Sequence, residues 1–376
     1  MPYWRLSSFY FFYFGLLGCI SPYWGLFLNS QGMSVLQIAQ LVALFGITRI
    51  VAPVVWGALA DRTGKSLRLL RLGAGLCGLS FFSIFWAEGF WQLAIIVVLY
   101  GFFWAAVLPQ FEVITLNYLK GQMGLYSKIR LWGSVGFIVM VWGLGFVFDV
   151  IPVSTLPVFM LLLIAAIFLT SFTVSEPKTK SHHEEGHGLL KIFFKPQVIA
   201  FFVACFLMQV SHGAYYTFFS LFLDEQGYSR SEIGFLWAVG VIAEVLIFML
   251  MARISNILSM KNILLLSLFV AALRWYLTGH WVDSFILLLV LQIGHAATFG
   301  SMHAVSMHYV YHFFKGAHQG KGQSLYSGLA YGAGSAVGAY YAGILWDQYN
   351  AVFMFEMSGF AALIGLLVAF LFIKRS

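Results

Sequence analysis

The chain has 376 residues, of which 61% are hydrophobic and only 9% carry a charged side chain. A soluble globular domain has about 25% charged residues, so this composition excludes a water-soluble protein and predicts one that lies in a membrane. The formal net charge of +7 would suit a nucleic-acid partner, but its distribution along the chain excludes one, as shown below.

Hydrophobic runs of roughly 18 to 25 residues, long enough to cross a bilayer as helices, recur along the whole chain. We count about twelve such runs, and the pattern lacks the alternating strands of an outer-membrane barrel. In chain order they are centred near Leu17, Ile47, Cys77, Phe102, Val139, Leu163, Met208, Val245, Val270, Gly300, Ser335 and Ile364. The sequence therefore predicts an all-α membrane protein with twelve transmembrane helices.

A polar segment, 175–197, separates the first six spans from the last six and holds the longest charge run. We predict that it is a cytoplasmic linker between an N-terminal six-helix bundle, 1–174, and a C-terminal six-helix bundle, 198–376. Its stretch "HHEEGH", 182–187, has the composition of a metal-binding tract. Such runs are more often simply solvated, and we expect no metal site.

The two halves repeat one another. The stretch "LFLNSQGMS", 26–34, returns as "LFLDEQGYS", 221–229, at a constant offset of 195 positions. The offset continues in the pairs Ile38 and Ile233, Leu41 and Leu236, and Ala43 and Ala238. Repeats that run in the same direction, related by an axis along the membrane normal, are the architecture of major facilitator transporters.

Basic residues concentrate on one side of the predicted membrane. Most of the 21 Lys and Arg fall in segments that this topology places on the same side, and Arg230 alone falls on the opposite side. The same-side residues are Arg5, Arg62, Lys65, Arg68, Arg71, Lys120, Lys128, Lys178, Lys180, Lys191, Lys195, Arg253, Lys261, Lys315, Lys321, Lys374 and Arg375. The positive-inside rule then places both termini in the cytoplasm, so the basic charge reports topology and not a nucleic-acid partner.

The loop after the second span, "GALADRTGKS", resembles the signature Gly-x-x-x-Asp-Arg-x-Gly-Arg/Lys of the major facilitator superfamily. A small residue at the first position permits close helix approach, the acid suits the positive end of a neighbouring helix, and the basic residues suit an anionic leaflet. The resemblance implies a conformational latch made of Gly57, Asp61, Arg62, Gly64 and Lys65. The corresponding second-half stretch, "ARISNILSMK", has Asn256 in place of the acid, which predicts a one-sided latch.

Several ionisable residues lie inside predicted spans, where they are costly and by default mark function. Arg49 and Glu244 are themselves 195 positions apart, so the repeat predicts that they lie at equivalent depths in the two halves. The alternative for each charge is structural pairing within its own bundle. The others are Glu112, Arg130, Arg274, His212, His295 and His303.

The stretch "FEVITLNYLKGQMGLYSKIRLWGSVGF" resembles the part of lactose permease in which a span-four Glu pairs with a span-five Arg. That resemblance implies that Glu112 holds Arg130, and it extends to Glu244, Arg274 and His295. The permease pattern His-x-x-Glu departs here to His295-Ala-Ala-Thr298, and a threonine cannot carry a transported proton. Glu244 and His295 are the remaining candidates, because His titrates near neutral pH and a carboxyl out of water holds its proton more readily. His303 is a further candidate.

The segments "RIVAPVVWGALADRTGK", "RLWGSVGF", "LRWYLTG" and "GHAATFGSMHA" together resemble the bacterial 3-phenylpropionate transporter-like permeases, which are relatives of the lactose and nucleoside proton symporters. The resemblance implies uptake of an aromatic acid such as 3-phenylpropionate or cinnamate by proton symport. Guanidinium groups suit a carboxylate, so we expect the substrate to meet Arg49, Arg130 and Arg274, with Trp24 and Tyr215 against its ring.

Other functions remain open at this point. A sugar or nucleoside symporter, a drug efflux pump and a non-transporting sensor share the same fold, whereas no nucleophile with its base, metal triad or phosphate loop suggests an enzyme. We expect a monomer in the bacterial inner membrane, driven by a proton gradient without a cofactor. Its expected partners are a small substrate, protons and the lipid bilayer.

Overall fold

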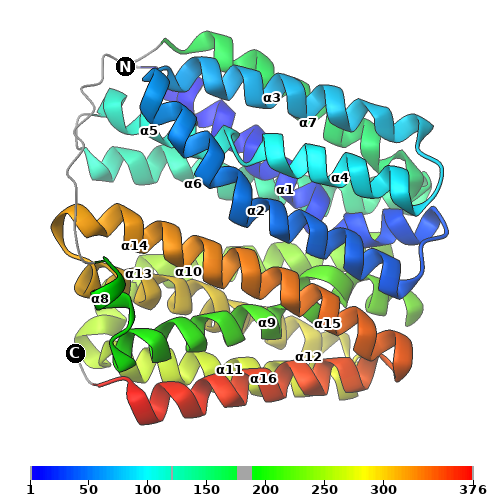
Figure 1. Ribbon diagram of the computed structural model, residues 1–376. Helices are drawn as coiled ribbons and strands as arrows, with labels where there is room; N and C mark the ends of the chain where they lie inside the picture. Colours follow the sequence, from blue (N-terminus) through cyan, green and yellow to red (C-terminus); the bar gives the residue numbers. More distant parts are fainter. Residues whose placement is uncertain (1, 120–121, 176–188, 375–376) are drawn as a thin grey trace. The chain divides into compact units, whose positions relative to one another are not determined.

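The computed structural model describes residues 2–119, 122–175 and 189–374 (Figure 1). Every regular element in these ranges is a helix. Eleven helices there are long and apolar enough to cross a membrane. The predicted eleventh span is instead built from α14 (Gln319–Tyr326), η6 (Ser327–Gly334) and α15 (Ser335–Gln348). The twelve predicted spans are thus all helical, and the predicted all-α membrane fold is confirmed.

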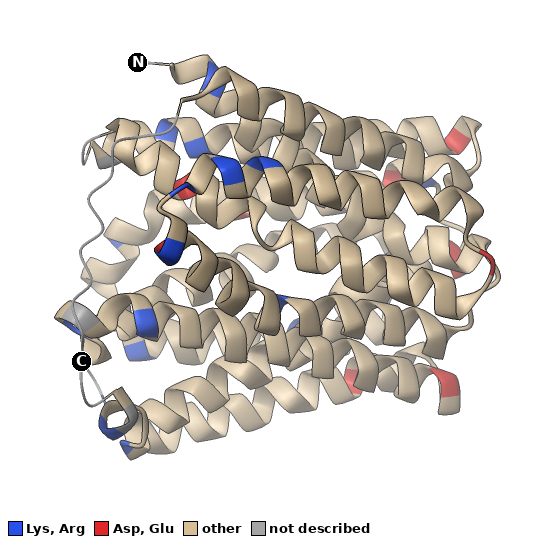
Figure 2. Cartoon of the chain, turned by 45° about the horizontal axis from the view of Figure 1, so that its top comes forward, with Lys and Arg blue, Asp and Glu red and all other residues tan. Residues whose placement is uncertain are grey.

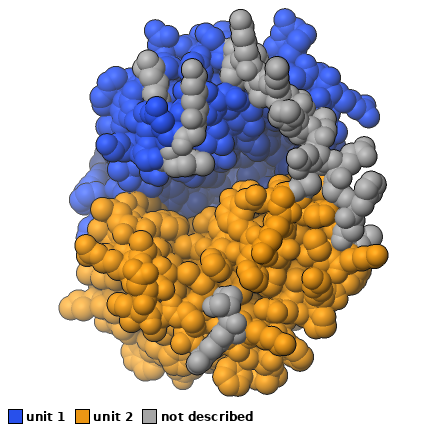
Figure 3. Space-filling view, turned by 90° about the vertical axis from the view of Figure 1, so that its left-hand side faces the viewer, with its two compact units in different colours: residues 1–182, 229–238 blue, residues 183–228, 239–376 orange. Residues whose placement is uncertain are grey.

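The chain forms two compact units, coloured separately in Figure 3. Unit 1 comprises residues 1–182 and 229–238. It contains the six helical spans that precede the linker and the first residues of a helix that continues into unit 2. Its elements are α1 (Tyr3–Ser30), α2 (Val35–Thr63), α3 (Ser66–Phe82), η1 (Ser83–Trp86), α4 (Phe90–Trp104), α5 (Val107–Leu119), α6 (Met123–Val150), η2 (Val153–Thr155), α7 (Leu156–Thr170) and η3 (Ser171–Thr173).

Unit 2 comprises residues 183–228 and 239–376. Besides the helices of the eleventh span, its elements are α8 (Leu189–Phe193), α9 (Pro196–Glu225), α10 (Arg230–Ile257), α11 (Met260–His280), α12 (Phe285–Ile293), η4 (Ala296–Ser301), α13 (Met302–Phe313), η5 (Gly316–His318) and α16 (Ala351–Phe372). The "HHEEGH" stretch of the predicted linker lies outside the described residues. The described end of that linker forms the short helix α8.

The nine-residue repeat encodes the same helix–turn–helix in both halves of the sequence. In each copy a helix ends before a glycine with positive φ, which is 77° at Gly32 and 85° at Gly227, a conformation that glycine adopts without steric cost. The next serine then caps the following helix. The Ser34 hydroxyl accepts from the Gln37 N–H at 3.2 Å, and the Ser229 hydroxyl accepts from the Glu232 N–H at 3.3 Å. The repeated letters therefore specify a repeated turn between spans.

The start of α10 belongs to unit 1 because it is anchored on α6. The Asp149 carboxylate accepts hydrogen bonds from the backbone N–H groups of Arg230 at 2.8 Å and Ser231 at 3.3 Å. These donors have no partner inside the helix, and a carboxylate is favourable beside them. Gly145 allows this close packing, since a Cβ atom there would meet the Arg230 carbonyl oxygen at 2.7 Å.

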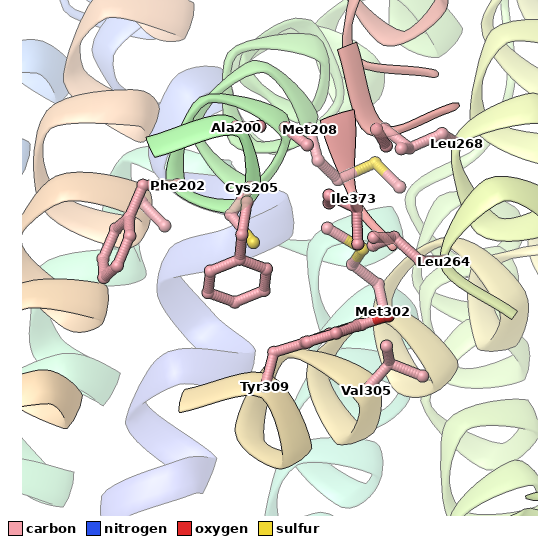
Figure 4. Packing of buried hydrophobic residues seen from close by; sticks show 14 of the residues in the cluster. Ala200, Phe202, Cys205, Met208, Leu264, Leu268, Met302, Val305, Tyr309 and Ile373 are labelled. Carbon is pink, nitrogen blue, oxygen red and sulfur yellow. The ribbon is translucent and has the colours of Figure 1, made fainter. Parts of the chain in front are cut away.

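Unit 2 is organised around a buried apolar cluster contributed by α9, α11, α13 and the end of α16, to which Phe202, Met208, Leu268 and Tyr309 belong (Figure 4). Helix α9 also packs directly on the eleventh span. A Cβ atom at Gly338 would meet the Val210 carbonyl oxygen at 2.6 Å, so the small residues of this span serve close helix contact.

Lys and Arg residues lie mainly towards one end of the helices within each unit (Figure 2). This is the pattern that the positive-inside rule describes for a membrane protein. Inside the apolar spans the charged residues are few, and their surroundings decide what they can do.

A buried charge cluster and candidate transport site

Arg274 on α11 is a buried cation in unit 2, with 1% of its surface exposed. Its Nε donates to the Leu291 carbonyl oxygen at 2.7 Å. Its Nη1 donates to His295 Nδ1 at 3.0 Å and to Thr298 Oγ1 at 3.2 Å. Its Nη2 donates to Gln292 Oε1 at 3.2 Å. The guanidinium is thus held in one orientation by groups of unit 2 itself.

His295 joins this cation to a carboxylate. It lies between α12 and the π-helical segment η4, and its Nε2 is 2.8 Å from Glu244 Oε1 on α10. The side chains of His295 and Glu244 are 4% and 15% exposed. Three helical spans therefore supply a continuous chain of guanidinium, imidazole and carboxylate, in which Glu244 is the member that reaches solvent-accessible surface.

Aromatic rings enclose the guanidinium of this cluster. Its Cζ lies 4.6 Å from the ring centre of Tyr215 and 4.4 Å from that of Trp275, within the range of cation–π attraction. The Tyr215 hydroxyl donates to Gln292 Oε1 at 2.8 Å. Both rings are buried, and in this structure they surround Arg274. The predicted role of Tyr215 at a substrate ring remains a prediction.

His212 on α9 closes the cluster on another side. Its Nδ1 lies 2.8 Å from the Met208 carbonyl oxygen, which can only accept a hydrogen bond, so Nδ1 carries a hydrogen. Its Nε2 lies 3.4 Å from Thr298 Oγ1. Its ring meets Trp275 edge to face at 4.9 Å.

Two glycines bring α10 close enough for Glu244 to reach His295. A Cβ atom at Gly240 would lie 3.4 Å from Gln292 Oε1 and 3.5 Å from His295 Cδ2. One at Gly300 would lie 2.5 Å from Ile247 Cγ2. Larger side chains at these positions would push the two spans apart.

His303, the third predicted proton site, lies apart from this cluster. Its Nδ1 is 3.0 Å from the Tyr331 hydroxyl on η6. The Phe299 ring is stacked between the two histidines, with centroids 5.5 Å from His295 and 6.4 Å from His303. The structure therefore brings together two of the three predicted proton-coupling residues.

Unit 1 presents its intramembrane cations differently. Arg49, at the middle of α2, is exposed and has no hydrogen-bond or ion-pair partner among the residues that the structure describes. It acts electrostatically on Tyr13 of α1. The Tyr13 ring is stacked on Trp104 with centroids 4.2 Å apart. An available cation thus lies near an aromatic surface, as a carboxylate site with an apolar wall would require.

Arg130 on α6 lies over an aromatic ring and not on a carboxylate. Its Cζ is 3.7 Å from the Phe14 ring centre. The direct ion pair with Glu112 is not formed in the described part of the chain, where no oxygen of Glu112 comes within 4.0 Å of the guanidinium. Glu112 instead accepts a hydrogen bond from the Tyr126 hydroxyl at 3.2 Å. Arg130 interacts electrostatically with both of these residues.

Trp24, predicted at the substrate ring, is buried in α1 with 8% of its surface exposed. Its ring is stacked on Phe27 at 5.2 Å and lies 6.2 Å from Phe81. These are contacts of the interior of unit 1. A substrate role for Trp24 remains a prediction.

The signature loop has a local role that its resemblance did not indicate. Gly64 has a φ of 62° and its N–H donates to the Ala60 carbonyl oxygen at 2.8 Å, so it ends α2 as a left-handed cap. The expected close helix approach at Gly57 is not seen, since a Cβ atom there would meet nothing within 4 Å. Asp61, Arg62 and Lys65 are exposed. The latch itself stays a prediction.

The sequence singled out His212 as an ionisable residue within a span but gave it no role, and it assigned none to Gln292, Thr298 or Tyr126, although each of the four contacts a predicted residue. A signal was present in the spacing. Gln292, His295 and Thr298 are three residues apart and so share one helix face. Arg274 contacts all three residues of this face. Among the described residues no group of three His, Cys, Asp or Glu side chains forms a metal site.

Comparison with known proteins fits this architecture. Residues 3–357 match the MFS_1 like family. The chain is 29% identical over 371 residues to the probable 3-phenylpropionic acid transporter of Escherichia coli K12, covering 94% of this chain and 93% of that protein. It is 27% identical over 381 residues to the maltose permease of Geobacillus stearothermophilus, covering 98% and 93%.

The fold is also that of a solved transporter. The crystal structure of the nucleoside transporter NupG superposes with a TM-score of 0.85 at 17% identity, covering 99% of this chain and 98% of that chain. At this identity the likeness concerns the fold alone. Taken with the family match, these findings show that the chain belongs to the MFS_1 like family and is a multi-pass membrane transporter, not an enzyme.

Proposed function

We propose that this transporter takes up a small aromatic carboxylate, such as 3-phenylpropionate or cinnamate, together with a proton. The observation that carries the coupling is the buried contact of Glu244 with His295, and of His295 with Arg274. Ionisable groups this deep in a membrane protein are typical of proton pathways. The substrate class rests on similarity to the probable 3-phenylpropionic acid transporter of Escherichia coli.

The residues of unit 1 suit the substrate anion. A guanidinium in contact with lipid is costly, so Arg49, exposed at the middle of its span, is expected to face water. There its unused donors are available to a carboxylate. Arg130 forms no direct ion pair among the described residues and lies on the Phe14 ring, so it is the second proposed contact, with Glu112 and Tyr126 nearby to orient it.

Transport proceeds in this proposal by alternating access, in which the two halves rock around a midplane site. The latch of Gly57, Asp61, Arg62, Gly64 and Lys65 stabilises one of the end states. The protein works as a monomer in a bacterial inner membrane with both termini in the cytoplasm. The proton gradient supplies the driving force and no cofactor takes part.

The test uses purified protein in liposomes that enclose a pH-sensitive dye. With no imposed gradient, addition of 3-phenylpropionate outside should acidify the interior, and Arg49→Ala should abolish this signal. A signal with a sugar or a nucleoside, and none with the acid, would keep the coupling and replace the substrate. That alternative is supported by the maltose permease among the relatives. If folded protein gave no acidification with the acid, the sugar or the nucleoside, proton symport would be refuted.

A further inference from the structure

We infer that Glu244, and not His295, carries the coupled proton, and that His295 stays neutral throughout as a fixed bridge between Glu244 and Arg274. This deepens the proposed function and rests on it, because both residues were candidates for the proton. The inference comes from the directions of the hydrogen bonds in the cluster.

The tautomer of His295 follows from its two neighbours. A guanidinium has N–H donors and no acceptor, so the 3.0 Å contact from Arg274 Nη1 requires a lone pair on His295 Nδ1. A neutral imidazole with a free Nδ1 holds its hydrogen on Nε2. That nitrogen is 2.8 Å from Glu244 Oε1, so it donates to the carboxylate.

A second proton on His295 has no place in this arrangement. It would bind Nδ1 and point an N–H at the N–H of Arg274, replacing a hydrogen bond by donor–donor repulsion. It would also place a cation beside the buried guanidinium, where charges interact more strongly than in water. His295 could take the proton only if the cluster first came apart.

The carboxyl of Glu244 meets no such obstacle. A protonated carboxyl retains acceptor capacity, so the bond from His295 can persist. Glu244 is also the more exposed of the two side chains, at 15% against 4%, which gives a proton a route to it.

The groups facing Glu244 and His295 from the neighbouring helices do not compete for the proton. From α11 comes Arg274, and from α12 and η4 come Gln292 and Thr298. From α9 come Tyr215, whose hydroxyl donates to Gln292, and Tyr216. His212 also comes from α9; its Nδ1 donates to a carbonyl oxygen, and a second proton on its Nε2 would place another cation beside the buried Arg274. Tyr331 of η6 interacts with Tyr216. Among these described groups, Arg274 is the one permanent charge.

Charge balance then links the proton to the substrate. With Glu244 ionised, its negative charge compensates Arg274 through the neutral imidazole. When Glu244 takes a proton, the cation of unit 2 loses its counter-charge, and the local potential favours entry of an anion. Proton and carboxylate therefore load together in this scheme, without direct substrate contact to Arg274.

The experiment compares Glu244→Gln, Glu244→Asp and His295→Gln in the liposome assay, together with substrate exchange, which needs no net proton movement. Glutamine at 295 carries an amide N–H group that can donate and a carbonyl oxygen that can accept, so it can replace both contacts of the neutral imidazole. We expect Glu244→Gln to keep exchange and lose acidification, and Glu244→Asp to keep both. His295→Gln should keep both within about threefold to tenfold, the cost of one imperfect hydrogen bond.

The second histidine–glutamate contact of unit 2, His280 Nε2 to Glu356 Oε1 at 2.8 Å, supplies the matched controls His280→Gln and Glu356→Gln, which should behave as wild type.

A second measurement does not depend on transport. Nitrogen-15 spectra of the full-length protein in lipid nanodiscs, with labelled histidine, should show one side chain fixed as the neutral Nε2–H form between about pH 5 and pH 8. The signal of His295 is the one that His295→Gln removes. A cationic His295 in this range, or loss of acidification in His295→Gln with exchange intact, would overturn the inference and leave symport standing. Absence of acidification in the wild type with every substrate class would overturn the proposed function, and the coupling role with it.

Discussion

The two units differ in how the charges within their apolar spans are satisfied. In unit 2, Arg274 is fully buried and its donors are used by four groups of its own unit. In unit 1, Arg49 is exposed and unpaired among the described residues, and Arg130 rests on an aromatic ring. A satisfied charge is fixed in place, whereas an unsatisfied one is available to a ligand.

The difference suggests that the two repeats have different roles in transport. Arg49 and Glu244 occupy equivalent positions of the repeat, yet Glu244 has an ion-pair partner 2.8 Å away and Arg49 has none in the part of the chain that the structure describes. We therefore propose that the proton binds in unit 2 and the carboxylate in unit 1. Three substitutions test these separate roles of the two units.

The largest effect is expected in unit 2, from Arg274→Gln. Removing one partner of a buried charge pair leaves the other uncompensated, which costs about 3–5 kcal/mol. We expect a large loss of thermal stability in detergent or nanodiscs. The double variant Arg274→Gln with Glu244→Gln removes both charges and should recover most of this loss. A double variant no more stable than Arg274→Gln alone would contradict the pairing through His295.

In unit 1, the matched change Arg49→Gln should act on function and not on stability. An exposed side chain without partners contributes about 0.5 kcal/mol or less to folding, so the melting temperature should hardly change. Uptake and exchange of 3-phenylpropionate should both be lost, because the carboxylate loses its cation. Arg49→Lys should recover part of the activity, since lysine keeps the charge without the bidentate geometry. Equal destabilisation by Arg49→Gln and Arg274→Gln would remove the contrast between the units.

The sequence was sufficient for the fold because the bilayer imposes a length on each span and the repeat imposes the order of the halves. Predicted span centres such as Ile47 and Val139 lie inside observed helices. The helix caps at Ser34 and Ser229 are likewise readable from local sequence, since a cap depends on residues within one turn.

The site was less predictable because the hydrogen-bond and ion-pair partners of a charged side chain come from residues that are distant in the chain. Arg274 and Arg49 look alike in the sequence, as single arginines in apolar spans. Only the packing of α9, α11 and α12 reveals that Arg274 has its donors occupied. The same applies to Glu112 and Arg130, whose spacing suggested an ion pair, while the structure gives Glu112 the hydroxyl of Tyr126.

The smallest effect is expected from Tyr126→Phe, which removes this hydrogen bond to Glu112 without removing a charge. A single hydrogen bond to a charged group is worth about 1.5–3 kcal/mol, and less where water can replace the hydroxyl; both Tyr126 and Glu112 are only partly buried. If Tyr126 keeps Glu112 away from Arg130, the variant frees the carboxylate to pair with the guanidinium and so to compete with the substrate anion. We therefore expect a severalfold higher KM for 3-phenylpropionate with little change in melting temperature.

Tyr118→Phe, on a tyrosine whose hydroxyl contacts the backbone of Ser175 instead, serves as the control. An unchanged KM in Tyr126→Phe would argue that Arg130 does not meet the carboxylate, and would leave Arg49 as its sole proposed cation.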